Sequence, residues 1–139
     1  MAAASRHSRR TRLALVPLAA LAAATAAATL APTPAAAAVK NSCTISGCTA
    51  AENAYEGWSE LGWPISRGWY SWSSGKCSYA GGEYYNNNGQ LPYGDTFWEY
   101  DVYPRNCGAH RDAYRIVVDG DTGQAWYSPD HYSDFHEFR

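Results

Sequence analysis

The chain has 139 residues, of which 46% are hydrophobic, 14% aromatic and 17% charged, and its formal net charge is −2. These values exclude a multidomain protein and a disordered chain. All six Trp and all eleven Tyr residues lie beyond residue 38, whereas the residues before it are rich in alanine. We therefore expect one small, aromatic-rich domain behind an alanine-rich leader.

The leader has the pattern of an export signal. Four arginines precede an apolar Leu/Ala run over residues 13–31, and small residues suited to cleavage extend to Ala38. A retained membrane anchor is the alternative, but alanine is weakly hydrophobic and Pro32 and Pro34 break the run. The pattern predicts a signal peptide over residues 1–38 and a secreted, extracellular protein with no membrane segment after cleavage.

Residues 39–139 form the predicted domain. Removing the first 38 of the 139 residues leaves 101, a length that buries about 65% of the unfolded chain's surface. This part holds all thirteen acidic residues but only seven of the eleven Lys and Arg residues, so its formal charge is −6 with neutral histidines. That balance excludes a generic basic surface that coats nucleic acid.

The domain has four cysteines, Cys43, Cys48, Cys77 and Cys107. An even number in an exported chain favours two disulfides, and the lack of a tight CxxC pair argues against a zinc site. Four cysteines allow three pairings. We favour Cys43–Cys48 with Cys77–Cys107, and we expect no metal or other cofactor.

The first predicted element is a helix that ends at Gly62. Thr49 and Glu52 have the spacing of a capping box. Gly57 inside the helix costs about 1 kcal/mol relative to alanine, so the helix should depend on docking its apolar stripe against a sheet. The stripe at helical spacing consists of Ala51, Ala54, Tyr55, Trp58 and Leu61.

Residues 62–93 are crowded with Gly, Ser, Asn and Pro, which predicts turns more than regular elements. Within this stretch, Trp69, Tyr70 and Trp72 have two interpretations. They pack over the core, or they form a stacking platform for glycan. The second interpretation would make the protein a secreted, aromatic-rich glycan-binding module.

Beyond Pro92 the apolar pattern has period two, which is typical of strands. In residues 97–103, the apolar side chains share one face and the acids Glu99 and Asp101 point to the other. A strand over 113–119 should place Tyr114, Ile116 and Val118 inward and Arg115 outward. Further strands are expected over 124–128 and 131–138. The sum is an antiparallel meander backed by a helix.

Pairing of these strands in order would bring charged side chains together on one sheet face. Glu99, Arg115 and His131 would share it, with Arg111 just before the arginine strand. The set suits phosphodiester transfer, because a carboxylate can accept the ribose 2′-OH proton and an imidazolium can protonate the leaving 5′-oxygen. Arginines can bind the phosphate charge. The alternative is a row of solvated surface residues.

Six blocks of the sequence resemble, in order and spacing, the secreted microbial guanyl-specific ribonucleases of the barnase type. The resemblance covers nearly all of the predicted domain. It implies an α+β fold with an N-terminal helix packed on a mostly antiparallel sheet, and a metal-independent endoribonuclease. The blocks are Leu61-Gly-Trp63, Gly81-Gly82-Glu83, Asn88-Gly89-Gln90-Leu91-Pro92, Trp98-Glu99-Tyr100-Asp101-Val102, His110-Arg111-Asp-Ala-Tyr-Arg115-Ile-Val and Asp130-His131-Tyr132-Ser-Asp-Phe135.

The resemblance also implies roles for single residues. Glu99 matches the family's general base, His131 its general acid, and Arg111 and Arg115 its phosphate-binding arginines. Tyr132 matches an aromatic residue that lines the base or phosphate subsite. The implied reaction is transesterification of single-stranded RNA to a 2′,3′-cyclic phosphate, followed by hydrolysis.

Other polar residues have no family role. We expect His110 and His136 to be exposed or structural, and Asp101 to orient an arginine. The lysine that some relatives carry on an early helix near the phosphate has no counterpart around Tyr55. A catalytically silent member of the same fold, binding RNA or an inhibitor, is a further alternative.

The predicted base-binding loop departs from the family most clearly. It comprises Tyr85, Asn86, Asn87 and Asn88, where relatives have a guanine-binding glutamate at the position of Asn88. A neutral amide lacks the charge-assisted pair, so guanine preference should be weakened. The expected partners are single-stranded RNA and a candidate protein inhibitor, and we expect a monomer.

Overall fold

The computed structural model describes residues 38–92 and 96–139, all within one compact unit of the chain. Apart from Ala38, the predicted signal peptide over residues 1–38 lies outside this part. No helix in the described residues is long and apolar enough to cross a membrane. These residues form one α-helix, a short 3-10 turn and seven β-strands, so the domain is α+β as predicted.

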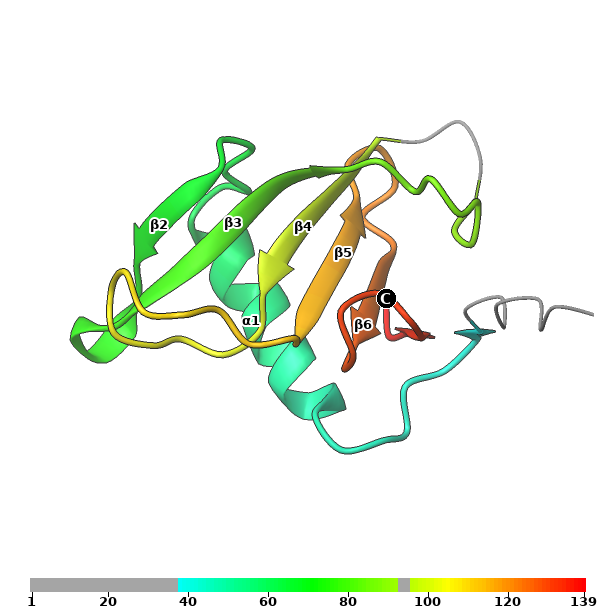
Figure 1. Cartoon of the computed structure of the whole chain (residues 1–139), viewed down its shortest axis with the longest axis horizontal. Coiled ribbons are helices and arrows are strands. Elements are labelled where there is room, and N and C mark those ends of the chain that lie inside the picture. Colours follow the sequence, from blue (N-terminus) through cyan, green and yellow to red (C-terminus); the bar gives the residue numbers. More distant parts are fainter. Residues whose placement is uncertain (1–37, 93–95) are drawn as a thin grey trace, which may run out of the picture. The chain divides into compact units, whose positions relative to one another are not determined.

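The strands form one sheet with the spatial order β1-β7-β6-β5-β4-β3-β2. Figure 1 labels β2 to β6 of this sheet. Neighbouring strands are antiparallel, except that β1 and β7 run parallel. The mostly antiparallel meander is therefore confirmed. The strands are β1 Val39–Lys40, β2 Gly68–Ser71, β3 Cys77–Tyr84, β4 Phe97–Asp101, β5 Arg115–Asp119, β6 Ala125–Ser128 and β7 Phe135–Glu137.

Helix α1, Cys48–Glu60, begins earlier than the predicted capping box. The chain enters it through Gly47, whose φ is 97°, and no side chain caps the helix. The prediction of a capping box at Thr49 and Glu52 is wrong, because Thr49 is already inside the first turn and cannot act as the N-cap.

The apolar stripe of α1 docks on the sheet as the sequence predicts. Trp58 is fully buried, and its ring centroid lies 4.9 Å from that of Tyr100 on β4. Its indole Nε1 also donates to the backbone oxygen of Asp101 at 3.0 Å. This bond fixes the helix to the end of β4.

Gly57 allows a second aromatic ring to rest on α1. A Cβ at Gly57 would lie 2.3 Å from the indole of Trp72, which in turn packs 4.9 Å from Trp58. A larger residue would push this indole off the helix. Gly57 therefore lowers the intrinsic stability of the helix by about 1 kcal/mol, but it allows the indole of Trp72 to pack closely on the helix.

The two predicted disulfides are confirmed. Cys43–Cys48 closes the turn at the start of α1. Cys77–Cys107 joins the start of β3 to the loop between β4 and β5. The second bridge holds that loop against the sheet, since the backbones of Cys77 and Arg105 also exchange two hydrogen bonds of 2.8 Å.

The prediction of turns over residues 62–93 is wrong for the four residues of β2 and the eight of β3. Strands β2 and β3 lie there, and they pair in the register Trp69↔Tyr79. Their glycines and serines concealed the period-two pattern, because a glycine gives no side chain to either face. Pairing of β3 with neighbours on both sides supplies the stability that its composition lacks.

The ends of the last strands also differ from the prediction. Tyr114 was expected to point inward, but it lies before β5 in the preceding loop, is 39% exposed, and contacts the ring of Tyr103. The last strand was expected over residues 131–138 but covers only Phe135–Glu137. Residues before it form a turn around Asp130, because the carboxylate of Asp130 accepts from two backbone amides of that turn.

Apolar side chains pack on both faces of the sheet. The larger core lies between the sheet and α1 and includes Trp58, Tyr100 and Ile116. A smaller core on the opposite face includes Val117, Trp126 and Phe135. The rest of that opposite face carries charged side chains, which form the candidate site.

Candidate active site

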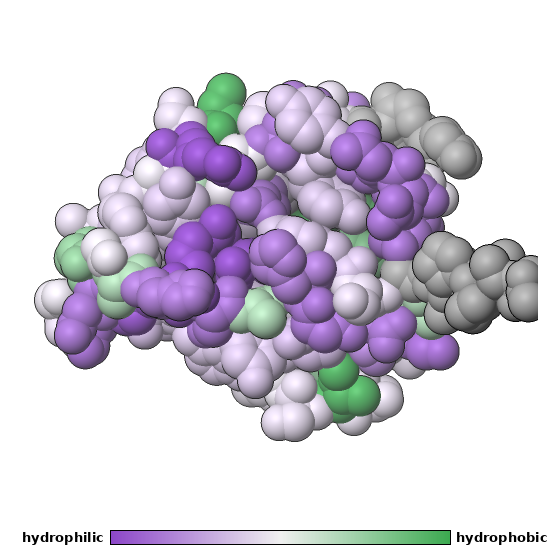
Figure 2. Space-filling model, in the orientation of Figure 1, coloured by the Kyte–Doolittle hydropathy of each residue, from purple (hydrophilic) through white to green (hydrophobic). Residues whose placement is uncertain are grey.

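The sheet face away from α1 carries the predicted site residues. Glu99 and Asp101 on β4 point to this face, because Trp98 and Tyr100 point to the α1 side. Arg115 on β5 is the register partner of Asp101 on β4, so its side chain lies on the same face as the two acids. Figure 2 views this face, with α1 behind the strands, and shows strongly hydrophilic side chains gathered over its middle. We call it the site face.

Asp101 is the centre of a buried ion cluster. Its side chain is fully buried, and its Oδ1 accepts from Nε and Nη2 of Arg111 at 2.9 and 2.7 Å. Nη1 of Arg115 lies 3.2 Å from the same oxygen, and Arg105 lies 3.5 Å from Oδ2. Asp101 therefore orients the arginines, as the sequence led us to expect.

Arg115 is almost completely buried, with a relative exposure of 2%. Its Nη1 donates to the Tyr114 backbone oxygen at 2.8 Å, and its Nη2 donates to the Asp112 backbone oxygen at 2.7 Å. Burial lowers the pKa of Arg115, and the charge of Asp101 acts against that shift. An arginine still remains charged, so Arg115 is a fixed cation at the base of the site.

Glu99 lies beside the arginine cluster. Its side chain is 8% exposed, and its Oε1 is 3.5 Å from Nη1 of Arg111. The backbone of Gly81 on β3 passes directly against it: a Cβ at this position would lie 1.5 Å from Oε1. Glycine at position 81 therefore creates the space that the carboxylate occupies.

Tyr84 at the end of β3 is affected by this carboxylate. Burial raises the pKa of Tyr84, and the negative charge of Glu99 raises it further.

Arg67 borders the site, although the sequence pattern gave no sign of it. Its Nη2 lies 3.9 Å from Oε1 of Glu99, and its Nε donates to the Gly81 backbone oxygen at 2.7 Å. It belongs to the stretch expected to form turns, directly before β2. A sequence pattern that predicted β2 would have indicated Arg67, because residues two apart in a strand, such as Arg67 and Trp69, point to the same face.

His131 lies in the turn before β7, not at the start of a strand. Its φ is 57° and that of Tyr132 is 74°, so both residues have a left-handed conformation. The backbone N–H of His131 donates to the Ala113 oxygen at 3.0 Å, and that of Tyr132 donates to the Ser128 hydroxyl at 2.8 Å. These bonds hold the imidazole next to the segment that leads into β5.

An open groove of about 580 Å³ joins these residues. Arg111, Arg115 and His131 all line it. The structure thus brings three of the four predicted catalytic residues to one groove, and Arg111 connects the groove to Glu99. Its lining residues are His110, Arg111, Asp112, Ala113, Arg115 and His131.

Of the two histidines without a predicted role, His110 is exposed and lies at the groove, whereas His136 is buried in β7. The hydroxyl of Tyr55 on α1 donates to the Gly123 backbone oxygen at 3.1 Å. Within the described residues, no group of three or more His, Cys, Asp or Glu side chains is placed to hold a metal ion.

The predicted base-binding loop follows β3. The amide of Asn86 is occupied within the loop, since it bonds both the N–H and the oxygen of Leu91 at 3.1 and 3.0 Å. Asn87 and Asn88 are exposed at the tip, and Tyr85 is 72% exposed. Asn86 therefore shapes the loop, while the other three side chains are free to meet a ligand from solvent.

Tyr132 connects this loop to the groove. Its ring centroid lies 4.9 Å from that of Tyr84 at the end of β3 and 4.7 Å from that of His131. Tyr132 thus contacts both the strand residue that precedes the predicted base-binding loop and the predicted acid. A ligand that spans the loop and the groove would pass over Tyr132.

Comparison with known proteins agrees with the site. No curated protein matches the chain significantly. A sequence model of a protein family described as ribonuclease matches residues 31–139, which is most of the chain. The family implies an RNA substrate and RNA cleavage. Its match includes every residue of the groove and of the ion cluster, and the chain is therefore a member of the ribonuclease family.

Proposed function

We propose that the protein is a secreted, metal-independent endoribonuclease of the guanyl-specific microbial type. It cleaves single-stranded RNA to a 2′,3′-cyclic phosphate and then hydrolyses that intermediate. The observation that carries the proposal is the position of Arg111, which contacts Glu99 at 3.5 Å and lines the same groove as Arg115 and His131. A base, an acid and two cations can therefore act on one phosphate.

Glu99 is the general base of the first step. Its carboxylate accepts the 2′-OH proton while the 2′-oxygen forms a bond to phosphorus. It is almost completely buried and lies 3.5 Å from the cation Arg111, which would also contact the phosphate. RNA supplies its own nucleophile, so the step needs no metal-bound water.

His131 is the general acid. The imidazolium donates a proton to the 5′-oxygen as the bond between that oxygen and phosphorus breaks. In the second step the roles are exchanged: His131 accepts a proton from water, and Glu99 returns a proton to the 2′-oxygen. The exposed position of His131 in its turn gives the leaving group access to solvent.

Arg111 and Arg115 stabilise the phosphate charge in the transition state. Both are held by Asp101 before substrate arrives, so they need little reorganisation during the reaction. The domain after residue 38 has a formal charge of −6, so long-range attraction of RNA is weak and binding depends on these local cations.

Base preference depends on the loop that holds Tyr85, Asn86, Asn87 and Asn88. Backbone amides of this loop bind the guanine oxygen, while the neutral Asn88 replaces the charged acceptor of relatives. Tyr132 lines the subsite. We propose a modest preference for cleavage after guanosine.

The chain organisation follows from the same proposal. Residues 1–38 are a signal peptide, residues 39–139 are the mature ribonuclease domain, and the mature protein is a monomer. Two disulfides favour an oxidising compartment outside the cytosol. An inhibitor protein that covers the groove is a candidate second partner.

The test is digestion of homopolymeric and mixed RNA by the purified mature protein, with and without EDTA, and with DNA as a control. We expect RNA cleavage that EDTA does not change, a 2′,3′-cyclic phosphate at the new ends, and intact DNA. Loss of activity in EDTA would contradict the mechanism. Binding of RNA without cleavage would favour the catalytically silent alternative.

The glycan-binding alternative has no support in the aromatic side chains that suggested it. Tyr70 and Trp72 pack on Trp58 beneath the α1 side of the sheet, at 5.9 and 4.9 Å. Trp69 lies on the opposite face, against Tyr79 at 5.2 Å. The three rings therefore do not form one platform.

A further inference from the structure

The site face continues beyond Glu99 to the outer strand β2. Two rows of side chains cross the strands there, and each row begins at a residue of the candidate site. The first runs from Glu99 over Gly81 to Arg67, and the second runs from Arg111 over Tyr79 to Trp69. Neither Arg67 nor Trp69 has a role in the proposed chemistry.

The first row places a cation at the border of the site. Arg67 is exposed, with 67% of its side chain accessible, yet its position is fixed by the bond from its Nε to the Gly81 backbone oxygen. Nη2 reaches to 3.9 Å from Glu99. The remaining donors of the guanidinium face solvent and are available to a phosphate.

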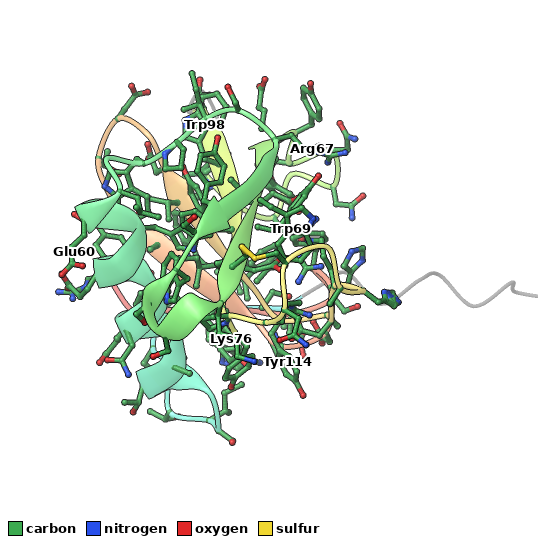
Figure 3. The ribbon with its side chains drawn as sticks, turned by 90° about the vertical axis from the view of Figure 1, so that its left-hand side faces the viewer. Glu60, Arg67, Trp69, Lys76, Trp98 and Tyr114 are labelled. Atoms are coloured by element: carbon green, nitrogen blue, oxygen red, sulfur yellow. A yellow bond between two sulfur atoms is a disulfide. The ribbon has the colours of Figure 1, made fainter. Side chains whose placement is uncertain are left out.

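The second row places an aromatic surface next to that cation. The guanidinium of Arg111 lies over the ring of Tyr79 at 4.3 Å, and the partly exposed indole of Trp69 meets Tyr79 edge to face at 5.2 Å. Trp69 follows Arg67 by two residues, so both point to the same side of β2. Figure 3 shows both labels on the side of the sheet away from Glu60, which lies on α1.

We propose that Arg67 and Trp69 form a subsite for an RNA nucleotide beyond the two that flank the cleaved bond. Trp69 stacks on its base, and Arg67 binds its phosphate. Alternation of a cation and an aromatic ring along a groove is the arrangement that binds single strands without sequence preference. The position of the subsite relative to the cleaved bond rests on the proposed function. Binding of a nucleotide by Arg67 and Trp69 does not.

The structure also explains why this subsite would matter for this chain. The domain repels RNA at long range because its formal charge is −6. A stacked base contributes affinity that does not depend on net charge, by about five- to a hundredfold. Longer substrates should therefore be preferred over a dinucleotide.

The experiment compares kcat/KM for a dinucleoside monophosphate with kcat/KM for the same step in a hexanucleotide. The variants are Trp69→Leu, which keeps apolar bulk against Tyr79, and Arg67→Gln. The matched controls are Trp72→Leu on the α1 side and Lys76→Gln at the far end of the β2–β3 hairpin, where Lys76 is exposed. Melting curves confirm that each variant is folded.

We expect the hexanucleotide-to-dinucleotide ratio to fall about tenfold in Trp69→Leu and to stay at the wild-type value in both controls. In Arg67→Gln, the dependence of log kcat/KM on log salt concentration should become less steep by about 0.7, the value for one phosphate contact on a single strand. An unchanged ratio in Trp69→Leu together with an unchanged salt slope in Arg67→Gln would overturn the proposal.

A binding measurement separates failure of the subsite from failure of the proposed function. The probe is a 2′-O-methyl hexanucleotide, which cannot be cleaved because it has no free 2′-OH. Wild-type protein should bind it about tenfold more tightly than Trp69→Leu does, whether or not the protein cleaves RNA. Equal dissociation constants for the two proteins would contradict the subsite, even if RNA cleavage is normal.

Discussion

The two faces of the central sheet use the same strands for opposite purposes. On the α1 side, β4 and β5 contribute Tyr100 and Ile116 to a dry apolar core. On the site face, the alternate residues of the same strands are Asp101 and Arg115, which are just as deeply buried but charged. Each apolar residue that stabilises the fold thus lies next to a buried charged residue. That charge destabilises the fold unless it has an oppositely charged partner.

Charged groups on the site face are tolerated because they bind one another. Removal of a charge from water costs several kcal/mol, which only close oppositely charged partners offset. Asp101 has three arginines around it. The charged part of the site face is therefore held in place by its own electrostatics, while the larger apolar core lies on the α1 side.

Trp58→Ala tests the apolar face and should have the largest effect. The indole is fully buried between α1 and β4, so we expect a loss of about 4 kcal/mol in the free energy of unfolding, measured by urea denaturation. Trp58→Phe is the matched control. It keeps most of the ring but loses the bond to the Asp101 oxygen, and it should cost about 1 kcal/mol or somewhat more. A loss below 1 kcal/mol in Trp58→Ala would show that the α1 face does not dominate stability.

Asp101→Asn tests the charged face. It leaves Arg115 buried without its main counter-charge, so we expect a loss of about 3 kcal/mol in unfolding free energy. It should also lower kcat/KM, because Arg111 loses the carboxylate that orients it. Asp121→Asn at an exposed position is the control and should change neither value. If Asp101→Asn is as stable as wild type, the ion cluster is not held in the way described.

Glu99→Gln and His131→Gln test the chemistry with little expected effect on stability. Each removes one proton-transfer group, so turnover of RNA should fall about a hundredfold, which equals about 2.7 kcal/mol. Glu83→Gln on the neighbouring strand is the control for loss of a carboxylate, since Glu83 is exposed. Wild-type turnover in either catalytic variant would refute the corresponding role.

Asn88→Glu should give the smallest change. A carboxylate at the exposed loop tip restores a charged acceptor for guanine, so the ratio of cleavage after guanosine to cleavage after adenosine should rise about tenfold, or about 1.4 kcal/mol. Asn53→Glu on α1 adds the same charge far from the loop and should leave the ratio unchanged. The same ratio in both variants would mean that Asn88 does not face the base.

The elements that the sequence predicts well are those with a strong period. The stripe of α1 and the alternation in β4 and β5 were readable because apolar and polar residues are separated by face. The parity of β4 also placed Glu99 and Asp101 on one side. The disulfide pairing followed from proximity along the chain and from the need to fix the loop before Arg111.

The features that the sequence did not reveal depend on contacts between distant segments. Strand β3 is glycine-rich because Gly81 must pass against Glu99, a requirement that no local pattern contains. Arg67 joins the site only through pairing of β2 with β3. Residues around His131 form a turn and not a strand. The side chains of Asp130 and Ser128 accept hydrogen bonds from the backbone N–H groups of this turn, and these bonds outweigh the alternation of apolar and polar residues in the sequence.

The pairing of β1 with β7 has a consequence for the order in which the molecule is completed. From β2 to β7, each strand pairs with the one made just before it, so most of the sheet can assemble while the chain is still emerging. The other edge is different: the N–H of Ala38 donates to Asp134, and the N–H of Phe135 donates to the Ala38 oxygen. The first residues of the domain therefore pair only after β7 has been synthesised. His131 and β7 come late in chain order, so a partly synthesised chain that still lacks them has neither a paired β1 nor a finished groove.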